Sequence, residues 1–272
     1  MLQVLLFAQS VGKQGLDWVG RGRCSCRRRT FRALSTSMED RQGGDGHGGA
    51  GMVIPSKLRG DDPSRKSSLI WLHGLGDTAQ GWASAMPMFQ VPYMRFVLPT
   101  ASSRHVRVAG PFPVPAWSDI LDLDENAPED REGFLGSVQR IQSIIDGEIA
   151  SGVLPSRIAV GGFSQGGAVA LSVMMRSRVT LGAFIGASTW LPLRDSYPAE
   201  LSEANQKTPL IVLHGDRDGV VSPRWGQMSA DFVKSSCGVS DVTVKIYRGM
   251  DHSACPEEFV DIGNFLRKAI PE

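Results

Sequence analysis

Short apolar runs alternate along the chain with longer segments of mixed polarity. The runs with the length and nearly continuous apolar character of buried strands are Leu69 to Leu72, Arg95 to Leu98, Arg157 to Gly161, Ala183 to Gly186, Leu210 to Leu213 and Val242 to Tyr247. Strands that are apolar on both faces are typical of a parallel sheet that helices cover on both sides. The pattern therefore predicts a mostly parallel central sheet.

Two segments have the period of an amphipathic helix. The apolar residues of Arg131 to Ser151 fall on one stripe, which holds Phe134, Val138, Ile141, Ile145 and Ile149. The second segment, Pro256 to Ile270, has Glu257 and Glu258 near its start and basic residues near its end, which matches the helix dipole at both ends. Strands that alternate with helices in this way predict a three-layer α/β domain.

Residues 1–51 differ in composition from the rest of the chain. Residues 1–38 hold seven basic residues and one acidic residue, a net charge of +6, which leaves 22 basic and 27 acidic residues, a net charge of −5, for the remainder. Six of the eleven residues from Arg41 to Gly51 are Gly, a composition typical of a flexible linker. We therefore predict a disordered basic leader and Gly-rich linker (residues 1–51) and one folded domain (residues 52–272), which starts near Met52 or Val53.

The basic leader has several interpretations. Residues 21–37 are rich in Arg and Ser and contain no acidic residue, as in a transit peptide for a plastid or mitochondrion. Alternatively, the leader is a disordered extension, or translation starts at Met38 or Met52 rather than at the first Met. Cys24 and Cys26, which lie beside arginines, could also accept palmitate and attach the chain to an anionic membrane.

The composition excludes several classes of protein. The chain has 272 residues, 42% of them hydrophobic, and its 31 Gly show no three-residue repeat, which excludes a collagenous, coiled-coil or wholly disordered chain. No apolar run approaches the ~18 residues of a membrane-spanning helix, and the acidic main body has no nucleic-acid signature. Four Cys are too few and too poorly spaced for a disulfide framework or a zinc site. We expect free thiols at Cys237 and Cys255, a reducing compartment such as the cytoplasm, and no metal or cofactor.

Residues 157–171 carry the clearest chemical signal. An apolar strand pattern ends in GFSQG and continues directly into a helical pattern, which is the context of a GxSxG nucleophile elbow in an α/β-hydrolase fold. Ser164 occupies a strained turn in such an elbow, and side chains at Gly162 and Gly166 would collide with the neighbouring backbone. The backbone N–H of Gln165 then points toward the oxygen that gains negative charge during attack.

A serine nucleophile needs a histidine base, and that base needs a carboxylate. α/β-Hydrolases supply these groups in the chain order Ser, acid, His. The five histidines of the chain are His47, His73, His105, His214 and His252. His47 lies in the linker, and His73 and His105 precede the serine. Because His214 precedes the best acid, His252 remains as the predicted base; the alternative is that it is a solvent-exposed loop residue.

The acid is expected after the strand at residues 209–213, where Asp216 and Asp218 are both candidates. A carboxylate directly after a strand is usually held in the turn by nearby N–H groups, whereas one two residues later can reach an imidazole. We therefore predict Asp218 as the acid, ahead of Asp216. Asp251 is disfavoured because its side chain should diverge from that of its neighbour His252.

A second N–H donor for the oxyanion is expected in the loop after an early strand. Residues 69–77 supply an apolar strand and then a glycine-flanked turn, in which Leu75 could present its backbone N–H. His73 and Asp77 are interpreted as residues that fix this turn by hydrogen bonds rather than as catalytic groups. Leu75 and Gln165 are therefore the predicted oxyanion donors.

Six motifs in register resemble one known family. They are LHGLGDT at 72–78, PAWSDI at 115–120, GGFSQGGA at 161–168, WLPLR at 190–194, LHGDRD at 213–218 and GMDHSAC at 249–255. The set is similar to the acyl-protein thioesterase and lysophospholipase-like carboxylesterase family of the α/β-hydrolase superfamily, and the likeness covers about Met52 to Pro271. The resemblance implies Ser164, Asp218 and His252 as a catalytic triad. It also implies an oxyanion hole formed by the Leu75 and Gln165 N–H groups.

Members of this family hydrolyse thioesters that link fatty acids to protein cysteines, and several cleave lysophospholipids or short acyl esters. A long acyl chain needs an apolar groove, and the loop residues that could line it are Trp82, Met86, Met88, Trp117, Trp190 and Leu191. The sequence departs from the family pattern at Gly219, where relatives usually have Pro, at Ala79 and Gln80, and from Ser103 to Pro115. These departures lie near the expected groove and bear on chain-length preference rather than on mechanism.

The sequence thus predicts a metal-independent serine hydrolase that cleaves acyl thioesters or esters through an acyl-serine, with protein depalmitoylation as the preferred activity. The alternatives are a short-chain carboxylesterase or deacetylase, a lysophospholipase, and an inactive lipid-binding or partner-binding module. The expected partners are S-acylated proteins or small acyl esters, with transient contact with a membrane surface and no nucleic acid. We expect a monomer or a weak homodimer.

Overall fold

The computed structural model describes residues 49–57, 65–122, 124 and 127–272. The predictions about the leader, its transit peptide and its cysteines lie outside the described residues. Strand β1 (Gly49–Ile54) begins before the predicted domain start at Met52. A Cβ added to Gly51 would lie 3.2 Å from Leu98 O, so a glycine of the predicted linker instead lets β1 approach its neighbouring strand closely.

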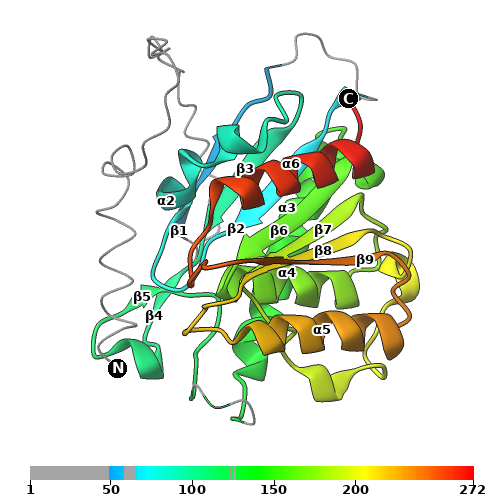
Figure 1. Ribbon diagram of the computed structural model, residues 1–272. Helices are drawn as coiled ribbons and strands as arrows, with labels where there is room; N and C mark the ends of the chain where they lie inside the picture. Colours follow the sequence, from blue (N-terminus) through cyan, green and yellow to red (C-terminus); the bar gives the residue numbers. More distant parts are fainter. Residues whose placement is uncertain (1–48, 58–64, 123, 125–126) are drawn as a thin grey trace.

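In the described part of the chain, seven strands form one sheet in the order β1-β3-β2-β6-β7-β8-β9 (Figure 1). Besides β1, these are β2 (Ser68–Leu72), β3 (Arg95–Thr100), β6 (Ile158–Phe163), β7 (Ala183–Ala187), β8 (Leu210–Gly215) and β9 (Val242–Tyr247). Neighbouring strands pair in parallel except β1, which runs antiparallel to β3. The mostly parallel sheet is confirmed, and each strand expected from the sequence is present.

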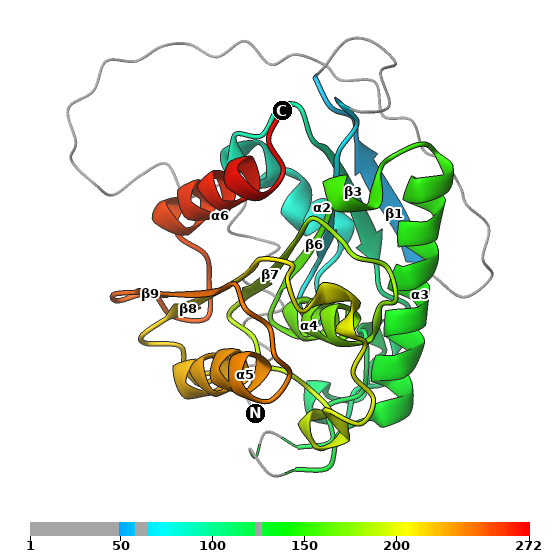
Figure 2. The ribbon, with the colours of Figure 1, turned by 90° about the vertical axis from the view of Figure 1, so that its right-hand side faces the viewer.

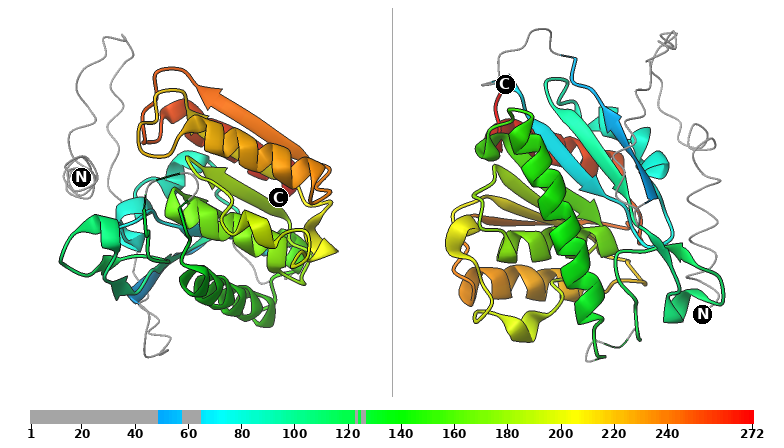
Figure 3. Two further views of the ribbon diagram at one scale, coloured as in Figure 1. Left: turned by 90° about the horizontal axis from the view of Figure 1, so that it is seen from below. Right: turned by 180° about the vertical axis from the view of Figure 1, so that it is seen from behind.

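Helices cover both faces of the sheet, as predicted. They are α2 (Ala79–Ala83), α3 (Arg131–Ala150), α4 (Gln165–Arg176), α5 (Pro223–Ser235) and α6 (Pro256–Ala269). Helices α3, α4 and α5 lie on one face and α6 on the other (Figure 2). The view from behind in Figure 3 shows α3 crossing its face of the sheet. Among the described residues, no helix has the length and apolar character that a bilayer-spanning segment requires.

Shorter elements join these layers. The 3-10 helices are η2 (Met86–Phe89), η3 (Arg107–Ala109), η4 (Pro155–Arg157), η5 (Arg194–Ser196) and η6 (Glu203–Asn205). The strands β4 (Ser103–Arg104) and β5 (Val114–Pro115) pair as a small antiparallel hairpin. This hairpin occupies the segment in which the sequence departs from the family pattern.

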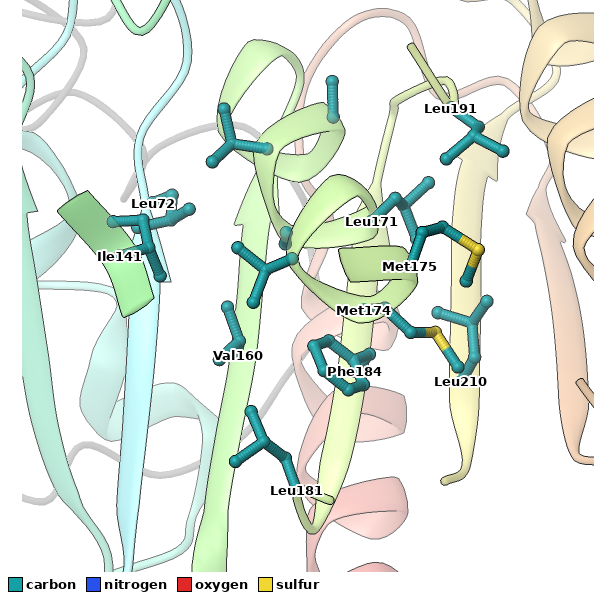
Figure 4. Close-up of a cluster of buried hydrophobic side chains, with 14 of the residues drawn as sticks. Leu72, Ile141, Val160, Leu171, Met174, Met175, Leu181, Phe184, Leu191 and Leu210 are labelled. Atoms are coloured by element: carbon teal, nitrogen blue, oxygen red, sulfur yellow. The ribbon is translucent and has the colours of Figure 1, made fainter. Parts of the chain in front are cut away.

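Alternate residues of each strand point to opposite faces, so the sheet has two cores. On one face, Val160 and Phe184 pack with Leu171 and its neighbours on α4 (Figure 4). On the other, Trp71 and Ile185 pack with apolar residues of α6. Burial on both faces holds the parallel strands firmly, so the loops at their carboxyl ends start from fixed positions.

The first turn of α6 departs from the simple dipole interpretation. Glu257 is exposed, whereas only 1% of Glu258 is exposed. No hydrogen bond of normal geometry reaches either oxygen of Glu258 from the described residues. Burial raises the pKa of Glu258 to about 8; the Cys255 N–H opposes this shift and the charge of Asp261 adds to it. At neutral pH the folded protein therefore holds Glu258 mainly as the neutral acid, which offers no charge to the helix dipole.

The stability gained by Glu258→Gln is expected to grow as the pH rises from about 4.5 to about 8. In this window the unfolded chain has lost the Glu258 proton while the folded state keeps it, so unfolding releases a proton. Wild-type stability then falls by up to about 1.4 kcal/mol per pH unit, and Gln removes that loss. Urea unfolding of both proteins across the window measures the effect. A difference that does not change with pH would contradict it.

Candidate active site

Ser164 lies in the sharp turn between β6 and α4. Its φ is 54° and its ψ is −122°, which is a strained backbone conformation for a residue with a side chain. The end of β7 holds this turn: Ser164 N–H donates to Ala187 O (2.8 Å), and Thr189 Oγ1 donates to Ser164 O (2.7 Å). A Cβ added to Gly162 would lie 2.5 Å from the carbonyl carbon of Gly166, so the turn needs a glycine there.

The structure brings together the three side chains predicted as nucleophile, base and acid. His252 Nε2 is 3.0 Å from Ser164 Oγ, and His252 Nδ1 is 2.7 Å from Asp218 Oδ2. Because a carboxylate only accepts hydrogen bonds, Nδ1 carries the proton and Nε2 offers its lone pair to the serine hydroxyl. The arrangement joins residues that are 88 and 34 positions apart in the chain. It can remove a proton from the hydroxyl and stabilise the resulting imidazolium.

Asp218 is held firmly in the hydrogen-bonded row Ser164–His252–Asp218. Its Oδ1 accepts the N–H groups of Val220 and Val221, both at 2.9 Å. Burial on its own would raise the pKa of Asp218, but hydrogen bonds from His214 and His252 outweigh it and hold the pKa well below its usual value. The carboxyl group therefore stays ionised far into the acid range and can orient an imidazole at neutral pH.

The residues set aside as base or acid occupy other positions. Asp216 is exposed, and its Oδ1 accepts the N–H of Gly249 (2.6 Å), which belongs to the loop after β9 and not to the turn of Asp216 itself. Asp251 and His105 are also exposed. His214 differs from them because it is fully buried and lies against Asp218. The elimination by chain order gave this histidine no role in the site.

The predicted oxyanion donors belong to segments that adjoin the nucleophile. Gln165 is the first residue of α4, so its N–H is one of those that have no partner within the helix. Leu75 follows Gly74, and a Cβ added to Gly74 would lie 3.4 Å from Ser164 Cβ. Within the described residues, neither N–H donates to a protein acceptor in a turn or loop. Leu75 and Gln165 therefore remain the predicted donors to a carbonyl oxygen that gains negative charge.

The Gln165 side chain has a structural role that the sequence reasoning missed. Its Oε1 accepts the Trp117 N–H (2.9 Å), and its Nε2 donates to Ser118 O (2.9 Å). Trp117 Nε1 in turn donates to His73 O (2.8 Å). The start of α4 is thereby connected through residues 115–118 to the loop that carries Leu75. The residue whose N–H is one predicted oxyanion donor thus also fixes the loop of the other predicted donor.

His73 and Asp77 fix the turn, in agreement with their interpretation from the sequence. His73 Nδ1 donates to Gly74 O (2.7 Å), and its Nε2 accepts the Ala101 N–H (2.9 Å). Burial lowers the pKa of His73 to about 4, so the ring is neutral at neutral pH and each nitrogen has one defined role. Asp77 Oδ1 accepts the Thr78 N–H at 2.7 Å.

The domain as a whole matches one protein family. Residues 57–270 fit the family model described as Phospholipase/Carboxylesterase. The chain belongs to the phospholipase/carboxylesterase family. Acyl-protein thioesterase 1 of Gibberella zeae is 37% identical over 217 residues, which are 75% of this chain and 91% of the relative. The family resemblance inferred from the six motifs is thereby confirmed.

Solved structures agree with this membership of the phospholipase/carboxylesterase family. The crystal structure of Zea mays acyl-protein thioesterase 2 has a TM-score of 0.74 and 31% identity, and the match covers 82% of this chain and 99% of that one. The crystal structure of Arabidopsis thaliana SOBER1 has a TM-score of 0.72 and 28% identity, with 75% and 99% of the two chains covered. The α/β-hydrolase fold predicted from the elbow is therefore confirmed.

The residues that were expected to line an acyl groove in this phospholipase/carboxylesterase fall into two groups. Met86, Trp117 and Leu191 are buried in the two cores. Trp82 and Trp190 are half-buried, and Met88 is exposed. Trp82 also reaches toward the site, because its ring centroid is 5.5 Å from that of Phe163, which lies 4.8 Å from the His252 ring. Of the six residues expected to line the groove, Trp82 is thus the one that ring contacts connect to the base.

Two further features bear on this family site. A Cβ added to Gly219, which stands where relatives usually have Pro, would meet nothing within 4 Å, so the change leaves room beside Asp218 without removing a contact. Among the residues that the structure describes, no group of three or more His, Cys, Asp or Glu side chains is arranged to hold a metal ion.

Proposed function

We propose that this protein is a serine hydrolase that cleaves acyl thioesters or oxygen esters through an acyl-serine intermediate, with S-palmitoylated proteins as its physiological substrates. The observation that carries the proposal is the row in which His252 joins Ser164 Oγ to Asp218 Oδ2 at 3.0 and 2.7 Å. The relatives named acyl-protein thioesterase support the choice of thioester over oxygen ester.

The reaction begins with attack of Ser164 Oγ on the acyl carbonyl carbon while His252 Nε2 takes the hydroxyl proton. The carbonyl oxygen gains negative charge between the N–H groups of Leu75 and Gln165, and each such donor stabilises the transition state by roughly 3 kcal/mol. The His252 imidazolium then gives its proton to the departing sulfur or oxygen as the C–S or C–O bond breaks, and the acyl-serine and a neutral His252 remain. In the second half, His252 takes a proton from water, the water oxygen attacks the acyl carbon, and the fatty acid leaves as Ser164 recovers its proton.

A thioester substrate suits this arrangement. The thiolate of cysteine is a good leaving group with a pKa of about 8.5, so it needs less protonation by His252 than an alkoxide does. Charge stabilisation at the carbonyl oxygen therefore contributes more to the reaction than acid assistance. The half-buried Trp82, next to Phe163, supplies apolar surface for the acyl chain close to the base.

The acyl preference is tested by comparing acetyl and palmitoyl thioesters as substrates of the purified full-length chain. A higher kcat/KM for the palmitoyl thioester is expected. Preference for the acetyl thioester would indicate a short-chain esterase or deacetylase instead of a depalmitoylase. A palmitoyl lysophospholipid, whose acyl chain is joined by an oxygen ester, is assayed beside the thioester. Faster hydrolysis of this oxygen ester would indicate a lysophospholipase instead.

A fluorophosphonate probe tests whether the site is reactive at all. The wild-type protein should be labelled and Ser164→Ala should not, because the probe forms a bond to an activated serine oxygen. If the wild-type protein is not labelled but still binds palmitate, the result would indicate a lipid-binding module instead of an enzyme. Labelling that persists in Ser164→Ala would place the reactive residue elsewhere in the chain.

A further inference from the structure

Asp218 Oδ2 lies between two imidazole rings, and the mechanism above uses only one of them. His252 Nδ1 is 2.7 Å from this oxygen. His214, near the end of β8, places its Nε2 3.1 Å from the same oxygen and 2.9 Å from Val221 O. The His214 side chain is fully buried, and it stands four residues before Asp218 in the chain. A buried histidine thus contacts the same carboxylate oxygen as the proposed base.

The surroundings of His214 determine which nitrogen carries its proton. Nε2 faces a carboxylate oxygen and a carbonyl oxygen, and both only accept hydrogen bonds, so Nε2 must be the donor. Nδ1 is buried and has no hydrogen-bond partner within the described residues. A Cβ added to Gly226 of α5 would lie 2.5 Å from Nδ1, so the helix backbone packs against this edge of the ring. The ring is held in one orientation with one N–H, which points at Asp218 and Val221.

We propose that His214 is a positioning residue for the reaction: its Nε2–H donates to Asp218 Oδ2, fixes the carboxylate opposite His252, and moderates the negative charge that Asp218 presents to the His252 imidazolium. The inference rests on the proposed function, because positioning has a meaning only if His252 acts as the base. No bond is made or broken at His214.

The contacts of Asp218 explain why a second imidazole matters. The N–H groups of Val220 and Val221 hold Oδ1, so the carboxylate plane is anchored at that end. His214 anchors the other oxygen, the one that faces His252. A carboxylate oxygen that already accepts one N–H carries less free charge, so it attracts an imidazolium less strongly. Removing the His214 N–H should therefore loosen Asp218 and strengthen its attraction for the His252 imidazolium.

Of the ionisable side chains, two imidazoles act most strongly on the carboxyl of Asp218. They are His214 of β8 and His252 of the loop before α6. The charged residues next to them in the chain are Asp216, Arg217 and Asp251, and all are exposed. Because the surroundings are the same in two variants of His214, a difference between the pH profiles of those variants reports the group at this position.

The test compares His214→Met with His214→Gln in the full-length chain. Met and Gln have similar length and volume, but only Gln can place an N–H near the position of the histidine Nε2. With a palmitoyl thioester, His214→Met is expected to lower kcat about tenfold with little change in KM, as for loss of one hydrogen bond to a charged group. The acidic limb of its kcat/KM profile should move to higher pH. His214→Gln should recover most of kcat and return the profile toward that of the wild type.

Two results would overturn the proposal. One is a folded His214→Met protein with wild-type kcat and a wild-type pH profile. The other is equal impairment of the Gln and Met variants, because ring packing and not the N–H would then be responsible. If His214→Met does not fold, nitrogen NMR of the wild-type protein with labelled histidine decides: a proton on Nε2 of His214 supports the proposal, and a proton on Nδ1 alone contradicts it.

Failure of this inference can be distinguished from failure of the proposed function. If the wild-type protein hydrolyses thioesters and Ser164→Ala does not, the proposed function stands whatever His214 does. If neither protein hydrolyses any acyl substrate, the proposed function fails, and with it the positioning role.

Discussion

Replacement of His252 by alanine is expected to lower kcat by roughly four to six powers of ten while the protein still folds. The substitution removes the group that takes the Ser164 proton, so the hydroxyl reverts to a weak nucleophile. Folding should survive because His252 lies in a loop between β9 and α6 and belongs to neither hydrophobic core. Hydrolysis of a palmitoyl thioester measures kcat, and thermal unfolding followed by circular dichroism checks the fold.

A matched control exists for this substitution. His105 is exposed, lies between β4 and η3 and makes no contact in the Ser164–His252–Asp218 row, so His105→Ala should leave kcat and thermal unfolding unchanged. Ser164→Ala should lose activity to a similar extent as His252→Ala, and the double variant should lose little more, because the two residues act as a unit. A His252→Ala protein that unfolds would show that this histidine is structural, and one that retains wild-type turnover would remove it from the mechanism.

The second large effect is expected for Gly166→Ala, which should abolish activity and destabilise the fold by about 3 kcal/mol or more. A Cβ at this position would clash with Leu72 O and would lie 2.5 Å from His73 O. Both atoms belong to the backbone at the end of β2, so no side-chain rotation can relieve the contact. The first turn of α4 would have to move away from β2, and the N–H of Gln165 would move with it.

Gly136→Ala is the control, because it makes the same chemical change on the exposed side of α3. A Cβ there would meet nothing within 4 Å, and alanine in a helix should stabilise the protein by about 0.5–1 kcal/mol. Urea unfolding and hydrolysis of the two variants separate the steric effect from the general one. If Gly166→Ala unfolds at the same urea concentration as the wild type and remains active, the elbow does not require a glycine there.

The sequence predicted the parts of the fold in which apolar residues follow a regular pattern. The six apolar runs are strands because both faces of the sheet are buried, and α3 was expected from its stripe of large apolar residues. By contrast, α5 was missed because its buried residues are Gly226, Ser229, Ala230 and Val233, which give a weak apolar signal. β1 was missed because a glycine-rich stretch is typical of a linker. In the structure, Gly51 of this stretch instead lies close to the backbone of β3.

The site was predictable where chain order and residue type limit the choices. With five histidines and a serine fixed by its elbow, order alone left His252, and the reach of a carboxylate beyond the strand favoured Asp218. The bonds of the Gln165 side chain could not be found in this way, because side-chain bonds between distant segments leave no periodic signal. His214 lies in the LHGDRD motif, four residues before Asp218, but the elimination by chain order considered it only as the base.

The groups of the row stand after strands of one half of the sheet: Ser164 after β6, Asp218 after β8 and His252 after the edge strand β9. The three groups therefore meet only when the sheet is paired out to this edge. Detachment of β9 alone would move the His252 loop away from Ser164 and abolish turnover while β6 and β7 stay packed between their two cores.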